Sequence, residues 1–151
     1  MASPNITMTD INSAALPSLQ FGNVDANSTS DVQTVYIWNN QGGSQALSDA
    51  TSTTITTKTR LGLDIGDTIA NGQEVVTNLY LQKKCTSLSE GSFTPTGGPT
   101  TASIGSSVGG TGVISGSING DNAIVALRIA APSNVTQGPV QFIIRVNYFY
   151  I

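Results

Sequence analysis

The sequence predicts an all-β protein, an antiparallel sandwich of about seven strands with an extended N-terminal arm. Two observations favour this fold class. Ser, Thr, Asn and Gly make up 64 of the 151 residues, and charged residues only 10%. That composition suits pleated sheets joined by polar turns, because helix surfaces are normally covered with Glu, Lys, Arg and Ala. Several segments also alternate apolar and polar side chains with the two-residue period of a strand.

The N-terminal part of the chain contains an irregular segment and then two strands. Residues 1–31 have scattered apolar side chains with neither a helical nor a strand period, and Pro4 and Pro17 interrupt regular structure. We expect this segment to be an arm, held either by its own domain or by a neighbouring molecule. Strands are expected over residues 32–38, which end in an Asn/Gly-rich turn, and over the β-branched run 50–60.

The middle of the chain is expected to hold one clear strand and a long biased stretch. A glycine-punctuated loop with a short strand over residues 61–73 precedes a predicted strand over 74–85. Alternate side chains of that strand would share one face: Val75, Thr77, Leu79 and Leu81. Residues 86–111, rich in Gly, Thr and Ser, form either an extended loop or a pair of weak edge strands. A short strand is expected over 112–118.

The C-terminal part carries the clearest strand signals. The pair Asn119-Gly120 readily supplies the positive φ of a tight turn, and a strand over 123–130 follows it. The inward side chains of that strand are expected to be Val125, Leu127 and Ile129. A connection over residues 132–139 leads to the last strand, over 140–151, where apolar and aromatic residues occupy every second position.

Length and charge narrow the domain organisation and the classes of function. We expect one sandwich domain over residues 32–151, since no helix is available for a parallel crossover. The net charge is −3 and basic residues do not cluster, so nothing predicts binding to nucleic acid. Residues 1–20 lack the features of a signal peptide, and no apolar run is long enough to span a membrane. We therefore expect synthesis in a cytoplasm.

The residue inventory argues against an enzyme. The chain has no histidine, so the usual general base and the commonest metal ligand are missing. Cys85 is the single cysteine and is interpreted as an inert strand-end residue. Asp64, Asp67 and Glu74 form the one acidic cluster, but their spacing does not match an EF-hand loop. We expect no catalytic residue, cofactor or metal ion, with a looser calcium site on this loop as the alternative.

Aromatic side chains allow two interpretations. Tyr36 and Trp38 share one face of a strand, as do Tyr148 and Tyr150. Exposed rings could bind a sugar, whereas burial of one face of each strand would use the rings in packing. Packing is the interpretation we favour, because a strand of a sandwich must bury one face.

Three stretches carry longer strand-and-turn patterns. In VYIWNNQGGSQALSDATSTTITT a strand ends in Asn and Gly before a second strand begins. LDIGDTIANGQEVVTNLYL has a Gly-containing turn before a strand, and LRIAAPSNVTQGPVQFIIRVNYFY has two strands joined through Pro and Gly. Together these stretches, about half of the chain, resemble bacterial and phage immunoglobulin-like domains. The resemblance implies an immunoglobulin-like β-sandwich, although the cysteine pair of antibody domains is absent.

The low charge, the Thr/Ser/Gly-rich body, the arm and the single sandwich also resemble small virion proteins of tailed phages. Head decoration (cement) proteins and head fibres are the nearest comparison. The resemblance implies a structural protein of the virion that binds the major capsid protein or other virion proteins, often as a trimer. We expect a homo-oligomer that is made in the host cytoplasm. A neck or tail component and a host-surface or glycan-binding module are the alternatives.

The arm is the expected contact element for such a partner. Its apolar side chains would leave water on binding, which contributes about 25 cal/mol per Å² of apolar surface, and many copies would add avidity. The candidate partner-binding residues are Ile6, Met8, Ile11, Leu16, Leu19 and Phe21.

Overall fold

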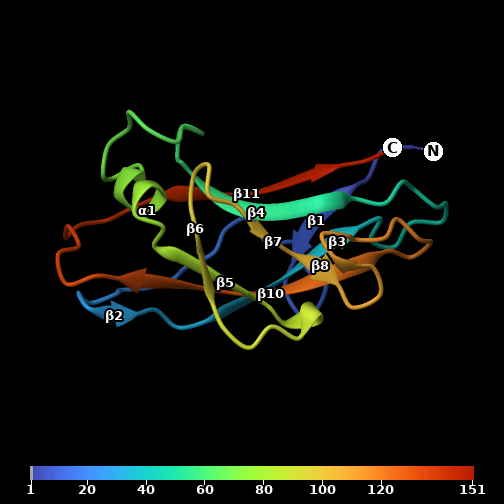
Figure 1. Ribbon diagram of the computed structural model, residues 1–151, viewed down its shortest axis with the longest axis horizontal. Coiled ribbons are helices and arrows are strands. Elements are labelled where there is room, and N and C mark those ends of the chain that lie inside the picture. The colour runs from blue at the N-terminus through green and yellow to red at the C-terminus, as the bar shows by residue number, and fades with distance from the viewer. Residues whose placement is uncertain (1) are drawn as a thin grey trace.

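The computed structural model describes residues 2–151, in which nearly all regular structure is β-strand. The strands form antiparallel sheets, and the two main layers face each other across one apolar core (Figure 1). The expected all-β, antiparallel fold class is confirmed. Among the described residues there are eleven strands, of which six are four residues or longer. No helix within that range is long and apolar enough to cross a membrane.

The larger sheet is built on two long central strands. β3 (Gln33–Asn39) pairs with β10 (Asp121–Ala131), and β1 (Ile6–Thr9) lies on the other side of β3. Beyond β10 follow β5 (Leu81–Cys85) and β6 (Thr94–Thr96). Since β3 and β10 have neighbours on both sides, their backbone groups are satisfied along most of their length.

The smaller sheet has β4 (Thr51–Thr59) at its centre. β11 (Phe142–Phe149) pairs with one side of β4, and the two-residue β7 (Ala102–Ser103) with the other. β8 (Gly105–Ser106) and β9 (Gly110–Thr111) form a separate two-stranded sheet, and in the sequence they lie between β7 and β10. The strands expected from the β-branched run and from the C-terminal alternation are confirmed, and β11 lies at an edge of this sheet.

The core is formed by alternate side chains of both sheets. The inward set expected for β10 is confirmed, because Val125, Leu127 and Ile129 are all buried there. From the smaller sheet come the fully buried Ile55 of β4 and the half-buried Ile144 of β11. Each buried aliphatic side chain contributes about 1.5–3 kcal/mol relative to exposure, so this shared core joins the two sheets.

The strand predicted over residues 74–85 is wrong in its first half. Its beginning is a short helix, α1 (Gln73–Thr77), and β5 begins only at Leu81. The helix covers one end of the core and buries two consecutive residues, Val75 and Val76. A strand would have put these two side chains on opposite faces, so closing the core end overrides the strand preference of valine.

The glycine-rich stretch forms short edge strands, which was one of its two predicted interpretations. After η1 (Thr86–Leu88) it supplies β6 and β7 to the two sheets and then the β8–β9 pair. The strand expected over residues 112–118 is reduced to a single bridge between Ile114 and Ala50. The expected turn is present at Asn119-Gly120, where φ is 70° and 86°.

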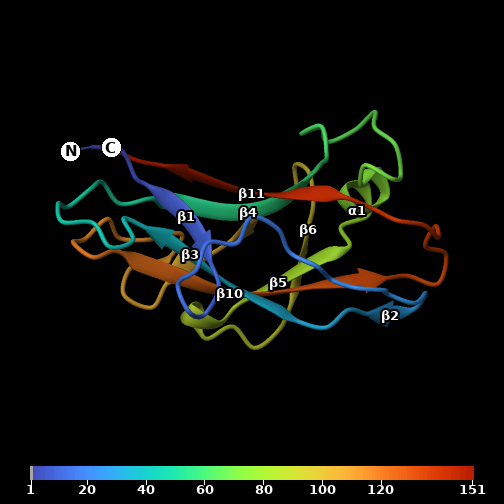
Figure 2. The ribbon, with the colours of Figure 1, turned by 180° about the vertical axis from the view of Figure 1, so that it is seen from behind.

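Two short strands lie within the segment predicted as an arm. β1 is the outer strand beside β3, and β2 (Ser28–Thr29) pairs with the end of β10. Between β1 and β2 the chain crosses the gap between β11 and the larger sheet, which Figure 2 shows as the blue segment running toward β2. Much of residues 2–31 therefore runs along the sandwich in this structure.

One buried ion pair holds the loop after β5. The side chain of Lys83 is 4% exposed, and its Nζ lies 2.9 Å from both carboxylate oxygens of Glu90. Nζ also donates to the Ser103 carbonyl of β7 at 2.6 Å, and Glu90 accepts from the Cys85 N–H at 2.7 Å. A buried charge needs such partners, so the pair fixes the loop and β7 relative to β5.

Removing one member of this pair should destabilise the protein strongly. In Glu90→Gln the buried ammonium of Lys83 keeps no counter-charge, and we expect a loss of about 3 kcal/mol in the free energy of unfolding. The control is Asp64→Asn, which breaks the more exposed Lys58–Asp64 pair and should cost less than about 1 kcal/mol. Urea unfolding measures both variants. Equal losses in the two variants would show that the Lys83–Glu90 pair stabilises the fold no more than the Lys58–Asp64 pair does.

Candidate functional site

The structure packs most of the predicted partner-binding residues against the chain's own core. The side chains that are half-buried there are Ile6, Met8, Leu16, Leu19 and Phe21. Ile11, at the turn after β1, is the sixth candidate and is exposed. The residues are thus brought together on one side of the sandwich. The five packed side chains are only partly buried, so part of each is still available to a partner.

Residues 16–24, which we call the strap, are held mainly by side chains. Asp10 closes the turn before it and accepts from the N–H groups of Asn12 and Ala14 at 2.8 and 3.0 Å. Phe21 stacks on Phe142 of β11 with 6.2 Å between the ring centroids. Within the described chain no backbone–backbone hydrogen bond involves residues 17–24. The strap is therefore an apolar cover rather than a strand of either sheet.

A different surface presents large apolar side chains to solvent. The loop between β4 and α1 has four aliphatic residues that are between 42% and 80% exposed: Leu61, Leu63, Ile65 and Ile69. Val140, which precedes β11, is also exposed and lies beside the loop, because the Gln141 N–H donates to the Ala70 carbonyl at 2.9 Å. We call these five residues the apolar end patch. The loop projects beyond β11 next to α1 (Figure 1).

Polar side chains fix the backbone of this loop. Gln73 accepts from the Asp67 N–H at 2.9 Å and donates to the Asp64 carbonyl at 3.0 Å. The Asn71 amide donates to the Asp67 carboxylate at 2.9 Å. The nearby Thr59 hydroxyl and the amide of Asn71 lower the pKa of Asp67. The polar groups therefore point into the loop while the aliphatic side chains point out, the reverse of an ordinary surface loop.

The acidic residues of the loop do not converge. Asp64 forms an ion pair with Lys58, whereas the Glu74 carboxylate accepts from the Tyr80 hydroxyl at 2.7 Å. Asp67 receives the Thr68 N–H at 2.7 Å in addition to Asn71. Nowhere in residues 2–151 do three Asp, Glu or Cys side chains form a group that could hold a metal ion. Each carboxylate of the cluster thus has a separate structural partner.

Glu74 and Tyr80 form a partly buried hydrogen-bonded pair beside a shallow hollow. The bond from Tyr80, and that from Thr136, lower the pKa of Glu74. Burial, with the adjacent carboxylate, raises the pKa of Tyr80 to about 12. The buried ring of Tyr80 cannot serve as an exposed stacking platform. The pair links α1 to the start of β5 and has a structural effect that depends on pH.

The Tyr80–Glu74 bond should stabilise the fold only over a defined pH range. Its contribution is full between the ordinary pKa values of 4.5 for Glu and 10.0 for Tyr. It is lost as pH falls through the lowered pKa of Glu74, and as pH rises through about 12 for Tyr80. Tyr80→Phe should lower the free energy of unfolding by about 1 kcal/mol at neutral pH. Its free energy of unfolding should also change less with pH at both the acidic and the alkaline end. Urea unfolding across pH, with Tyr36→Phe as control, measures this. Parallel pH curves for Tyr80→Phe and the unchanged protein would contradict the assignment.

The aromatic rings of β3 lie on the outward face of the larger sheet. Tyr36 and Trp38 are half-buried, and the Trp38 indole N–H donates to the Thr9 hydroxyl of β1 at 3.0 Å. On the same face Phe93 is covered by two cations, with the Arg128 guanidinium 3.9 Å and the Lys84 ammonium 4.9 Å from the ring centroid. These contacts engage the rings within the chain.

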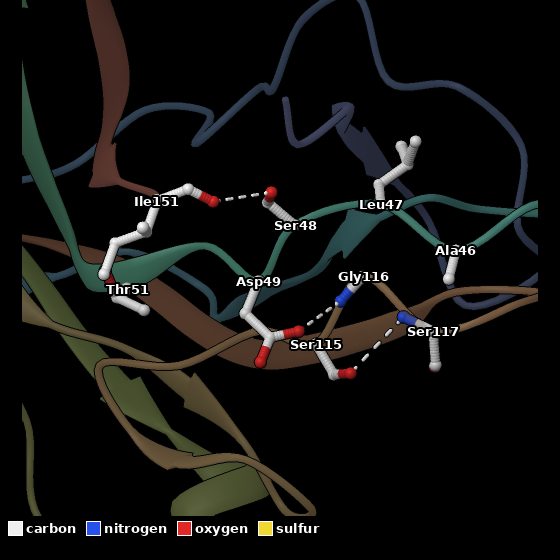
Figure 3. Close-up of a pocket in the computed structure, with 9 residues that line it drawn as sticks. All are labelled: Ala46, Leu47, Ser48, Asp49, Thr51, Ser115, Gly116, Ser117 and Ile151. Atoms are coloured by element: carbon white, nitrogen blue, oxygen red, sulfur yellow. Dashed lines mark hydrogen bonds between the residues drawn. The ribbon is translucent and has the colours of Figure 1, made fainter. Parts of the chain in front are cut away.

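The end of the molecule opposite the apolar end patch has a shallow hollow (Figure 3). Its polar groups are already paired. The Ser48 hydroxyl donates to the Ile151 carbonyl at 3.0 Å, and Asp49 accepts from the Gly116 N–H at 2.9 Å. Asp49 is the single acidic side chain among the residues that line it.

The exposed loop is the feature that sequence reasoning missed. The signal was present in LGLDIGDTIA, where large aliphatic residues recur between Gly and Asp. The short strand predicted within residues 61–73 is wrong, because no strand lies between β4 and α1. Hydropathy alone does not show that the aliphatic side chains of this loop would face solvent. Comparisons with protein-family models and with curated proteins find no match for this chain. The site must therefore be judged on its own geometry.

Proposed function

We propose that this chain is a structural protein that acts by docking on other proteins, and specifically a capsid decoration (cement) protein of a tailed phage. The observation that carries the proposal is the apolar end patch on a rigid loop. Four large aliphatic side chains exposed on one short loop favour a protein-interaction site. In this form, the partner would be the major capsid protein or another virion protein, and the mature location would be the virion.

The rigid loop favours docking over a role in folding. Side-chain hydrogen bonds from Gln73 and Asn71 hold its backbone in one conformation before any partner arrives. A preorganised surface loses less conformational entropy on binding, so more of the gain from apolar burial appears as affinity. Repeated copies on a lattice would then multiply the effect of a modest single contact.

The finer fold assignment belongs to the same proposal. Two facing antiparallel sheets, with the C-terminal strand at an edge of the smaller one, support an immunoglobulin-like sandwich. The absence of histidine from the sequence and the separate partners of Asp64, Asp67 and Glu74 support a role without catalysis. A neck or tail component would use the same surface in the same way.

A glycan-binding role is the alternative, and it requires accessible aromatic rings. The Tyr80 ring is buried, and the Trp38 indole N–H is engaged with Thr9. These contacts favour docking through the apolar end patch. In a glycan array, loss of a signal in Trp38→Ala would support the alternative.

Replacing the patch should abolish docking without unfolding the protein. We expect the combined change of Leu61, Leu63, Ile65 and Ile69 to Ser to lower affinity for phage heads at least about tenfold, as loss of central apolar contacts does. The measurement is cosedimentation of the purified chain with purified heads that lack it.

The control carries the same number of exposed aliphatic-to-Ser changes away from the patch and from the candidate residues of the N-terminal segment: Val32, Val108, Ile118 and Ile151. Because all eight positions are exposed, both variants should unfold within about 0.5 kcal/mol of the unchanged protein. Equal binding by the patch variant and the control would refute a role for the patch. Deleting residues 1–22 is a weaker test, because it also removes β1 from the larger sheet.

A further inference from the structure

β11 is a long strand at the edge of the smaller sheet, and its free side has no backbone partner within the described chain. Proteins usually protect edge strands by making them short or by placing Pro, Lys or a bulge in them. The other outer strands in residues 2–151 follow this rule, since β1 has four residues, β6 has three including Pro95, and β7 has two. β11 has eight residues without Pro or Lys, and the irregularity in its pairing adds the extra residue to β4, near Ser52.

The backbone of β4 shows which groups of β11 are free. The Thr53 N–H donates to the Gly112 carbonyl at 2.9 Å, and the Thr57 carbonyl accepts from the Gly98 N–H at 2.8 Å. Both residues thus direct their backbone groups away from β11. Since backbone groups alternate between the two sides of a strand, Thr54 and Thr56 are the residues that bond to β11.

The same alternation continues in β11. Arg145 lies opposite Thr56 and Asn147 opposite Thr54, so these two residues use their backbone groups within the sheet. The N–H and C=O groups of Ile144 and Val146 therefore point outward from the free edge. No hydrogen bond within the described chain reaches either residue from that side. The strap runs nearby but contributes side chains rather than backbone groups.

We propose that β11 pairs antiparallel with β11 of a second copy of this chain, across a twofold axis, so that the two smaller sheets become one continuous sheet. The pairing would satisfy the outward backbone groups of both copies. A second copy is the occupant that β11 itself favours, because its residues are symmetric about Val146. Arg145 and Asn147 occupy one pair of positions, and Ile143 and Phe149 the other. The low charge of the chain keeps repulsion between two copies small. The backbone groups that would pair belong to β11 and not to the residues of the apolar end patch, so the inference does not rest on capsid binding.

Side chains on the outward face select the register. A pairing centred on Arg145 would place two guanidinium groups directly opposite each other, which is unfavourable. A pairing centred on Val146 places Arg145 opposite Asn147 of the other copy. It also places Ile143 opposite Phe149, which are 37% and 71% exposed in the single chain. The Val146-centred register therefore removes the charge conflict and covers both exposed apolar side chains.

The first test removes the outward hydrogen bond. Val146→Pro deletes an N–H that the single chain does not use, and proline is tolerated on an edge strand when its nitrogen faces solvent. Val146→Ala is the matched control, because it shortens the side chain and keeps the N–H. Sedimentation velocity over a concentration series should show a dimer for the unchanged chain and for Val146→Ala, and a monomer for Val146→Pro. Circular dichroism should confirm that all three are folded.

The second test gains affinity and does not depend on a disruptive change. Asn147→Glu places a carboxylate opposite Arg145 of the other copy at two symmetric positions, which should lower the dimer Kd about fivefold. Asn147→Gln, of the same length and uncharged, should leave the Kd unchanged. Added salt should reduce the gain of Asn147→Glu.

A monomer at every concentration, a folded dimer of Val146→Pro, or no gain in Asn147→Glu would each overturn the inference. These measurements use the purified chain alone, so they separate this inference from the proposed function. A monomer that still binds phage heads through the apolar end patch refutes the β11 pairing only. A β11-paired dimer that binds no particle refutes the proposed function only.

Discussion

Two buried side-chain amides, those of Asn39 and Asn40, close one end of the sandwich, and the loops of that end depend on them. The Asn39 amide donates to the carbonyls of Ser48 and Ile114, each at 3.0 Å. The Asn40 amide lies within 3.1 Å of three further carbonyls, those of Gln45, Gly116 and Ser117. The carbonyls of Ile114, Gly116 and Ser117 also accept backbone N–H groups, whereas those of Ser48 and Gln45 have the two amides as their donors. A buried carbonyl without a donor costs about 1–3 kcal/mol, so the amides matter most for these two.

At the opposite end, side-chain amides again hydrogen-bond a loop, but the aliphatic side chains of that loop are exposed. Gln73 and Asn71 satisfy the loop between β4 and α1, much as Asn39 and Asn40 satisfy the loops at the first end. At the first end the loops fold over the core and leave a shallow, polar-paired hollow. At the second end α1 already covers the core with Val75 and Val76, so the aliphatic side chains of the loop have no interior left to fill. These side chains are exposed because α1 already fills that end of the core.

The parts of the fold that sequence could predict are those in which a two-residue period decides burial. β10 and β11 were predicted because large apolar residues occupy every second position and give each strand an inward face. α1 was missed because consecutive valines favour a strand locally, and only the need to cover the core end selects a helix. For the strap, the spacing of Leu16, Leu19 and Phe21 shows that these side chains need burial, but it cannot show whose core buries them. The exposed loop was missed because hydropathy does not report which way a fixed backbone turns its side chains.

The scarcity of charge connects these features to association. A chain with 10% charged residues has few lysines with which to block a sheet edge and little net charge to keep copies apart. It therefore protects its edges by shortness and by Pro95, which works for strands that contribute little to the core. β11 cannot be shortened in this way, because Ile144, Val146 and Tyr148 pack on the core from this strand. The same residues that complete the sandwich thus keep a long strand with outward backbone groups at the edge of the smaller sheet.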